Sequence, residues 1–450
     1  MQKQQEIDRL REENARLKDR LRYQERTAQE GFFGSSTPSS KLPVKSNTPG
    51  GEPSDQAGGA KAGHCGHGRK SVSAENADRV ELVSVAPSCP ECGGVLQHKG
   101  STARTVIDVE PLRRQTIHYS LEQKYCPRCR RVVRARPPGV LKRHLLGNCL
   151  LAHVAVQHYV FGVTLGQLEN QLGIGCGTLL GALHQLAGRL EPACQQLVKD
   201  YRQASVKHAD ETGWRTDGHN GYAWLFCSPQ ISLFRFRQTR SGQIAREVLG
   251  EEHLAGVLVV DRYHGYNRVP CAIQYCYAHL LRDVQDLEKE FPDQAEVLVF
   301  VSALAPLLAE AMKLRGRELK PAEFRDQARL IKDQIIDVTE ASAQHPSIQK
   351  IQNIFRENSE RLFHWAKKAK VPADNNRAER ELRPLVIARK ISFGSQSKAG
   401  ARTREILMSV LHTLRKRPGE VTSAFERALN RLAHDDALNP YDALFKIDSS

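Results

Sequence analysis

Three acidic residues in this chain have neighbours that would bring them to one site. Asp210 ends the segment VKHAD, and Asp261 follows the uninterrupted apolar run of residues 257–260, which is typical of a strand buried on both faces. Open α/β sheets place their sites at the carboxyl ends of such strands, so neighbouring strands would direct both aspartates into one cleft. Two close carboxylates repel each other unless a proton or a cation lies between them. A pair of Mg²⁺ ions about 4 Å apart would relieve this repulsion and could perform in-line phosphoryl transfer.

Glu379 is the candidate for the third metal-binding carboxylate. It lies in the segment DNNRAERELRP, where Asn375 or Asn376 is a good N-cap, so we expect a helix to begin just before it. Glu379 and Glu381 are two residues apart, about 200° around a helix, and cannot both point into one site. The helix can therefore present one carboxylate inward, although a solvated helix of mixed charge is the ordinary alternative.

The basic residues of the same segment indicate a polyanionic partner. Arg380 and Arg383 are three residues apart and share a helix face, and Pro384 is expected to kink or end the helix. The whole chain has 66 Lys and Arg against 51 Asp and Glu, a formal net charge of +15. That balance favours nucleic acid or an anionic membrane surface as the partner.

The composition also indicates the cellular compartment in which the protein is expected to work. We find no run of about 18 apolar residues, so we expect no membrane-spanning segment, and the polar N-terminus lacks the apolar core of a signal peptide. The eleven cysteines are an odd number, and only four form C-x-x-C pairs. This usage suits a reducing cytoplasm better than a disulfide framework.

The elements that must position the acids predict an α/β fold over residues 203–395. Five strand-like runs follow residue 203, with a helix near residues 242–250 between the third and the fourth, which indicates a mixed sheet. A helical stretch of about residues 280–370 reads as an insertion, and residues 396–450 read as a helical tail. The order of acid on a strand, acid on an apolar strand, insertion and acid on a capped helix is that of ribonuclease-H-like nucleases.

Two C-x-x-C pairs predict a zinc ribbon over residues 81–139. Cys89 and Cys92 are separated by 33 residues from Cys126 and Cys129, and each pair lies in a turn-forming segment. Tetrahedral Zn²⁺ takes four such thiolates. Two redox-active pairs are the alternative, which the lack of a βαβ context disfavours.

The remaining segments complete the predicted organisation. Residues 1–30 carry about three heptads and predict a coiled coil that would make the chain a homo-oligomer; a lone charged helix is the alternative. Residues 31–80 read as a basic disordered linker. Residues 140–202 are helical with the rhythm of a helix-turn-helix, but the second helix lacks Arg and Lys, so a packing bundle is favoured over a DNA-reading role.

Several segments together resemble the transposases of the insertion-sequence 66 family. They are HADETGWRTDGHNGYAWLF, VVDRYHGYNRV, YCYAHLLRDV and ADNNRAERELRPLVIARKISFGSQSKAG, and the upstream C-x-x-C pairs and heptads match in order. The resemblance implies a DNA transposase in which Asp210, Asp261 and Glu379 form a DDE triad that holds Mg²⁺ or Mn²⁺. Cys276 and His279 match a C-x-x-H element common among DDE transposases, with a structural role expected because two ligands are too few for a metal site.

The resemblance also implies the reaction and the partners. Water would cleave the transposon end to free a 3′-OH, which would then attack target DNA, with no covalent enzyme intermediate. The family's elements usually encode small accessory proteins, which become candidate partners. Two other functions stay open: a zinc-ribbon DNA-binding regulator with an inactive ribonuclease-H-like fold, and a nuclease without a role in transposition. The residues expected to bind DNA phosphates are Arg380, Arg383, Arg389, Lys390 and Lys398.

Overall fold

The computed structural model describes residues 114–446 and a few isolated positions before them (9, 75, 80, 92, 94 and 95). The chain divides into two compact units, one of residues 42–117 and one that contains residues 118–450 together with residues 1–41. All the helices and strands named below belong to residues 118–450. The predicted coiled coil, the predicted linker and Cys89 lie outside the described residues, apart from the isolated positions.

A five-stranded mixed sheet lies at the centre of the described unit, which confirms the predicted α/β class. The strand order is β5-β4-β3-β6-β7. Strands β3, β4 and β5 form an antiparallel meander, and β6 and β7 run parallel to β3. The five strands and the short helix after the third occur where the sequence predicted them: β3 Val206–Thr216, β4 His219–Cys227, β5 Ser232–Arg237, α6 Gln243–Leu249, β6 Val257–Val260 and β7 Ala272–Tyr275.

Local sequence explains two features of this sheet. All four residues of β6 are fully buried, as its apolar run predicted. The turn between β3 and β4 is Asp217-Gly218, and both residues have positive φ, 55° and 75°. Two-residue hairpin turns of type I′ need that conformation, which Asp-Gly adopts readily. The hairpin therefore fixes the register in which Thr216 faces His219.

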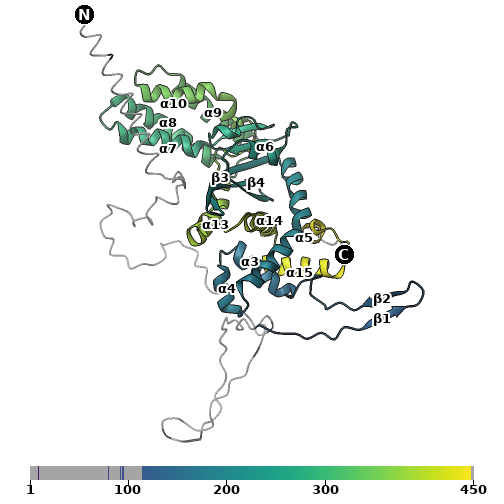
Figure 1. The fold of residues 1–450 in the computed structure, drawn as a ribbon. Helices are drawn as coiled ribbons and strands as arrows, with labels where there is room; N and C mark the ends of the chain where they lie inside the picture. Colours follow the sequence, from purple (N-terminus) through teal and green to yellow (C-terminus); the bar gives the residue numbers. More distant parts are fainter. Residues whose placement is uncertain are drawn as a thin grey trace, which may run out of the picture. The chain divides into compact units, whose positions relative to one another are not determined.

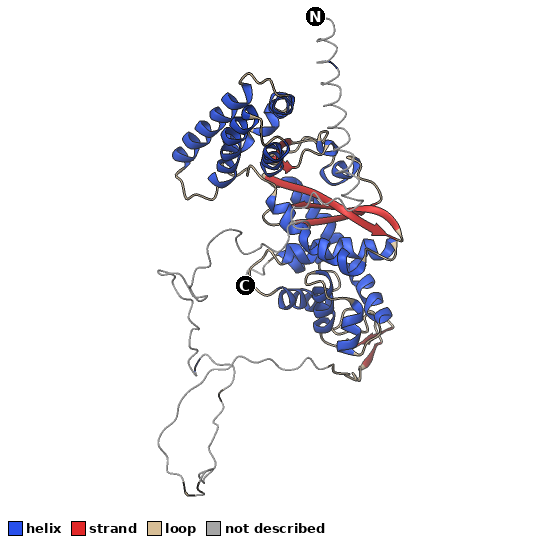
Figure 2. Ribbon diagram, turned by 90° about the vertical axis from the view of Figure 1, so that its left-hand side faces the viewer, coloured by secondary structure: helices blue, strands red, loops and turns tan. Residues whose placement is uncertain are grey.

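Helices lie on both sides of the sheet (Figure 2). Helix α13 (Asn376–Ser392) packs against β3 and β4, and α14 (Lys398–Leu414) packs against β5 and α5. Both lie below the sheet in Figure 1. Thus the predicted C-terminal tail contributes α14 to the main core and α15 to a contact with α3. The other helices of this group are α3 Asn148–Tyr159, α4 Leu165–Leu172, α5 Cys176–Gln203, α15 Val421–His434 and α16 Pro440–Phe445.

The predicted helix-turn-helix corresponds to α4 and α5, joined through Gly173 in the left-handed conformation. Helix α5 is 28 residues long, and its buried side packs against α14 and α16. This packing agrees with the bundle interpretation. A DNA-reading role for α5 stays a prediction.

Residues 277–367 contain helices and no strand, as predicted for the insertion. Helices α7, α8 and α9 pack side by side and appear at the top of Figure 1 with α10. Among the described residues, α8 is the one helix long and apolar enough to cross a membrane by length and composition. Its buried residues recur every three or four positions and pack on α7 and α9, as in a core helix. The bounds are α7 Tyr277–Glu290, α8 Ala295–Leu314, α9 Pro321–Glu340, α10 Pro346–Glu357, α11 Ser359–Leu362 and α12 His364–Lys367.

Helix α13 begins where the sequence predicted but continues past Pro384. It ends at Phe393, which has a φ of 58°, followed by Gly394 with a φ of 135°. A Cβ atom at Gly394 would lie 2.2 Å from the carbonyl oxygen of Arg215, so only glycine fits this approach. The end of α13 is thereby tied to β3, where Ser395 bridges to Thr216.

Candidate active site

Asp210 and Asp261 lie at the same level on neighbouring parallel strands. The register pairs His208 of β3 with Val259 of β6; Asp210 is two residues further along β3, and Asp261, directly after the last residue of β6, is two residues beyond Val259. Because side chains alternate with a period of two, the pairing continued by two residues places both carboxylates on one face of the sheet. Backbone amides hold them: the N–H of Glu211 donates to Asp210 Oδ1 (2.9 Å) and that of Tyr263 donates to Asp261 Oδ1 (3.0 Å).

Glu379 is in the first turn of α13, the helix that packs on β3. The start of this helix is held by Asn375, although the expected cap hydrogen bond from its side chain is absent. The Asn375 side chain instead contacts β3, with 2.9 Å from Oδ1 to His208 Nδ1 and 2.9 Å from Nδ2 to the carbonyl oxygen of Ala209. These contacts bring the first turn of α13 next to the strand that carries Asp210.

Glu381 points away from Glu379, as the helical geometry predicted. It accepts hydrogen bonds from Ser232 Oγ (2.7 Å) and Lys416 Nζ (2.8 Å), in a separate network at the end of β5. Glu379 Oε1 thus has no hydrogen-bond partner among the described residues, whereas Glu381 is used in packing.

The negative charges of the predicted acids contribute to the raised pKa values of Asp210 and Glu379. The pKa of Asp210 is raised well above its usual value, first by burial and then by the negative charges of Glu211, Asp261 and Glu379. Burial also raises the pKa of Asp261. The pKa of Glu379 is raised by burial and by the charges of Asp374 and Asp261, while Arg282 and Arg383 oppose the rise.

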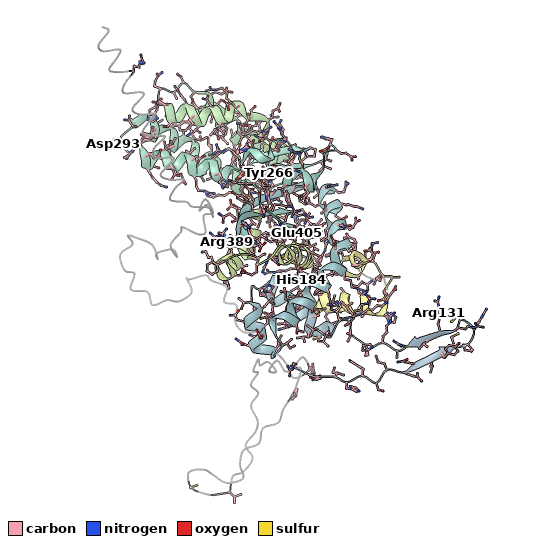
Figure 3. The ribbon with its side chains drawn as sticks, in the orientation of Figure 1. Arg131, His184, Tyr266, Asp293, Arg389 and Glu405 are labelled. Atoms are coloured by element: carbon pink, nitrogen blue, oxygen red, sulfur yellow. The ribbon has the colours of Figure 1, made fainter. Side chains whose placement is uncertain are left out.

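Glu211 is a fourth acid of this cluster that sequence reasoning missed. Its side chain is only 1% exposed, and it accepts hydrogen bonds from Tyr266 Oη and from Arg240 Nε (2.8 Å). Burial and the charge of Asp261 raise the pKa of Glu211 to about 7. In Figure 3 the label of Tyr266 lies above those of Arg389, on α13, and Glu405, on α14. The signal available in the sequence was an acid directly next to Asp210 within a strand.

The donor set of this cluster fits a hard divalent cation. Carboxylate oxygens are the ligands that Mg²⁺ and Mn²⁺ take in proteins. The mutual repulsion that raises the pKa of Asp210 would be relieved by a cation, and Glu379 Oε1 is buried without a hydrogen-bond partner among the described residues. The carboxylate donors present thus match the ligand chemistry of a hard divalent cation.

The residues predicted to bind DNA phosphates are divided between surface and interior. Arg380, Arg383, Lys390 and Lys398 are exposed. Arg389 is buried, and its Nη1 donates to Thr212 Oγ1 (2.8 Å) and to the carbonyl oxygen of Gly213 (2.7 Å). It therefore ties α13 to β3 and has no free surface for a phosphate. We leave it out of the proposed DNA-contacting set.

Cys126 and Cys129 lie at the turn of an exposed antiparallel hairpin of β1 (Gln123–Cys126) and β2 (Arg131–Arg134). Hydrogen bonds from the backbone and thiol of Cys129 and the backbone of Arg128 lower the pKa of the Cys126 thiol. A lowered thiol pKa favours the thiolate that a metal requires. Cys92 is exposed and belongs to the other unit, so the four-cysteine zinc site stays a prediction.

Cys276 and His279 lie at the start of α7, immediately after β7. Cys276 Sγ accepts a hydrogen bond from the backbone N–H of Asn375 (3.1 Å). Burial raises the pKa of the Cys276 thiol to about 12 and lowers that of His279 to about 4. The C-x-x-H element therefore borders the acidic cluster, as the sequence predicted.

Comparison with known proteins identifies the class of molecule. Residues 143–403 match the model of the family described as "Transposase IS66 family", which is more than half of the chain. The chain belongs to this family of transposases, and DNA is the substrate that transposases bind. It is also similar to two proteins of Sinorhizobium fredii (strain NBRC 101917 / NGR234). "Uncharacterized protein y4jD" is 23% identical over 369 residues, 72% of this chain and 71% of that protein, and "Uncharacterized protein y4hP" is 21% identical over 423 residues, 82% and 75%.

Proposed function

We propose that this protein is a DDE transposase that cleaves DNA at transposon ends and joins those ends to target DNA. The observation that supports this most strongly is the position of Asp210 and Asp261 on or directly after two paired parallel strands, with Glu379 in the first turn of the helix that packs on β3. The family match supports the same reading. The sheet order of an antiparallel three-strand meander followed by two parallel strands, with a helical insertion before the last acid, agrees with a ribonuclease-H-like catalytic domain.

In the proposed mechanism the protein positions charge and supplies no nucleophile. Asp210, Asp261 and Glu379 would hold Mg²⁺ or Mn²⁺ through their carboxylate oxygens. When bound, the cations would activate the attacking oxygen and stabilise the negative charge on the entering and leaving oxygens. The amides of Glu211 and Tyr263 fix the orientation of the two aspartates, so the ligands are preorganised before DNA arrives.

Two successive transfers complete the proposed reaction. Water first attacks the phosphodiester at the transposon end, one P–O bond forms as another breaks, and a 3′-OH leaves. That hydroxyl then attacks a phosphodiester of target DNA and displaces a second 3′-OH. Each step exchanges one P–O bond for another, so no oxidant, reductant or enzyme-linked intermediate is required.

The exposed basic residues of α13 and the start of α14 are the proposed DNA-contacting set. They are Arg380, Arg383, Lys390 and Lys398. Such contacts would position the phosphate backbone near the acids without reading sequence. The zinc ribbon, with its arginine-rich hairpin, and self-association through the predicted coiled coil would place the ends. Small accessory proteins would be further partners.

A strand-transfer assay tests this function. Purified protein is mixed with Mg²⁺, labelled DNA carrying the element's own ends and a supercoiled target plasmid. A transposase produces joined products, a nuclease without a role in transposition produces only nicks, and an inactive DNA-binding protein shifts the DNA without cutting it. The last two outcomes would each reject the proposal.

Asp261→Asn is the matched catalytic variant, because it keeps the shape of the side chain and removes its charge. We expect cleavage to be lost while DNA affinity is nearly unchanged. Asp283→Asn on α7 is the control, because the side chain of Asp283 is half-exposed and pairs with Arg262. An Asp261→Asn protein that cuts as fast as wild type would refute the assigned role.

A further inference from the structure

Next to the proposed triad, two buried polar atoms lack partners. His279 Nδ1 and Glu379 Oε1 are each buried and have no hydrogen-bond partner among the described residues. A nitrogen of Arg282 lies 3.9 Å from Glu379 Oε1, too far for a hydrogen bond. Buried donors and acceptors in folded proteins nearly always have partners, so such a pair calls for a bound species that satisfies both.

The nearby Cys276 completes a set of three ligands. One ligand atom from each of Cys276, His279 and Glu379 lies within 4.8 Å of the other two. We propose that these three side chains form a binding site for a transition-metal cation of the Zn²⁺ class, which shares only Glu379 with the all-carboxylate cluster. The sequence showed only two of the ligands; the fold adds the third.

The ligand chemistry distinguishes this site from the Mg²⁺ site. Thiolate and imidazole are ligands for Zn²⁺ and similar ions, whereas Mg²⁺ takes oxygen ligands. Tetrahedral Zn²⁺ with bonds of about 2.0–2.3 Å keeps its ligands roughly 3.3–3.7 Å apart, so side-chain movements of about 1 Å would close the site. Three protein ligands would leave a fourth position for water, as in zinc sites that are not purely structural.

The local fold holds the three ligands on two anchored helix starts. Cys276 and His279 are three residues apart at the beginning of α7, so they share a face of that helix. The backbone N–H of Cys276 donates to Val260 of β6 (2.8 Å), and that of Tyr277 donates to Ala373, just before α13 (2.8 Å). The backbone N–H of Asn375, at the start of α13, donates to Cys276 Sγ. Asn375 is four residues before Glu379, so this hydrogen bond ties Cys276 to the first turn that carries Glu379. Amide hydrogen bonds of this kind stabilise a metal-bound thiolate.

Occupancy of this site would bear on the proposed catalysis. Glu379 belongs to both ligand sets, so a Zn²⁺ ion on Cys276 and His279 would draw on the carboxylate that the triad needs. This consequence rests on the proposed function. The metal site itself does not, because it can be measured without DNA.

Metal binding by the full chain tests the inference. The protein is stripped with a chelator under reducing conditions, titrated with Zn²⁺, and its zinc content is measured after desalting; Co²⁺ serves as an optical probe through its thiolate charge-transfer band. Wild type should hold about one Zn²⁺ equivalent more than Cys276→Ser or His279→Gln. Loss of a residue that only orients a metal ligand lowers metal affinity by roughly 10- to 100-fold. Because Cys276→Ser and His279→Gln each remove a ligand, we expect them to lower zinc affinity at this site by more than that.

Matched variants make the result interpretable. Cys227→Ser changes another fully buried cysteine, in β4, and should keep the wild-type zinc content. A second set carries Cys126→Ser and Cys129→Ser, which removes the exposed hairpin thiols from the count. Equal zinc content and equal Co²⁺ spectra in wild type and in folded Cys276→Ser and His279→Gln proteins would overturn the inference. If wild-type protein binds zinc at this site but shows no strand transfer, that result would reject only the proposed function.

Discussion

The buried carboxyl of Glu211 predicts how the stability of the metal-free protein depends on pH. Burial and the charge of Asp261 raise its pKa from 4.5 to about 7. Because the folded-state pKa lies above the unfolded one, the contribution of Glu211 to stability is fully present below pH 4.5 and is lost as the pH rises towards 7. At about 1.36 kcal/mol for each pKa unit, the total is about 3 kcal/mol, most of which falls between pH 5 and pH 8.

Glu211→Gln removes this titration while keeping the shape of the side chain. We expect the free energy of unfolding of wild type to fall by about 2–3 kcal/mol more than that of the variant between pH 5 and pH 8 in chelator. The measurement is urea unfolding followed by tryptophan fluorescence, since all three tryptophans, Trp214, Trp224 and Trp365, are buried in this unit. The exposed Glu251→Gln is the control and should follow wild type.

Parallel pH profiles for wild type and Glu211→Gln would refute this reasoning. Mg²⁺ provides a second check, because a cation at the acidic cluster favours the ionised carboxylates. Adding Mg²⁺ should therefore flatten the wild-type profile more than that of the variant.

Three further predictions follow from the same structure. Glu405→Ala should lower the free energy of unfolding by about 3–5 kcal/mol, because it leaves the arginines that pair with it, such as Arg237 (2.8 Å), without a buried partner; a loss below about 1 kcal/mol would contradict this. Arg380→Ala with Lys390→Ala should weaken DNA binding alike for all sequences and reduce the salt dependence by about one phosphate contact per residue, measured by fluorescence anisotropy at several salt concentrations; an unchanged slope would remove them from the contact set. Cys126→Ser should lower the zinc content of the purified chain, and an unchanged content would reject the ribbon.

The sheet could be predicted from the sequence because its signals are local. The apolar run of residues 257–260 reflects burial of that strand on both faces, and the runs before it are rich in strand-forming residues. The helical character of residues 277–367 likewise follows from short-range periodicity. The candidate triad could be proposed from the sequence because each of the three acids is adjacent to one of these local signals.

Other features depended on contacts between distant segments and could not be predicted. Arg389 looks like a surface cation in the sequence, but its position along α13 directs it to the backbone of Gly213. Asn375 is the N-cap residue of α13, as expected, but its side chain bonds across to His208 and not to the helix backbone. Pro384 was expected to kink or end the helix, yet the sheet packing carries α13 through it to Ser392. In each case tertiary packing outweighed the local preference.

The same limit applies to Glu211 and to the C-x-x-H element. Burial of Glu211 results from the 3₁₀ helix η2 (His264–Tyr266), which places Tyr266 over β3 from 55 residues away. The third ligand that Cys276 and His279 lacked is about a hundred residues further along the chain. Only the folded chain brings such groups within bonding distance.

A crystal of the full chain grown with Mn²⁺ and measured for anomalous scattering tests the central claim most directly. The account predicts an anomalous peak with carboxylate oxygens of Asp210, Asp261 and Glu379 about 2.0–2.2 Å away, and loss of that peak in Asp261→Asn. A wild-type map without a peak among these three carboxylates, or a peak that persists unchanged in Asp261→Asn, would contradict it.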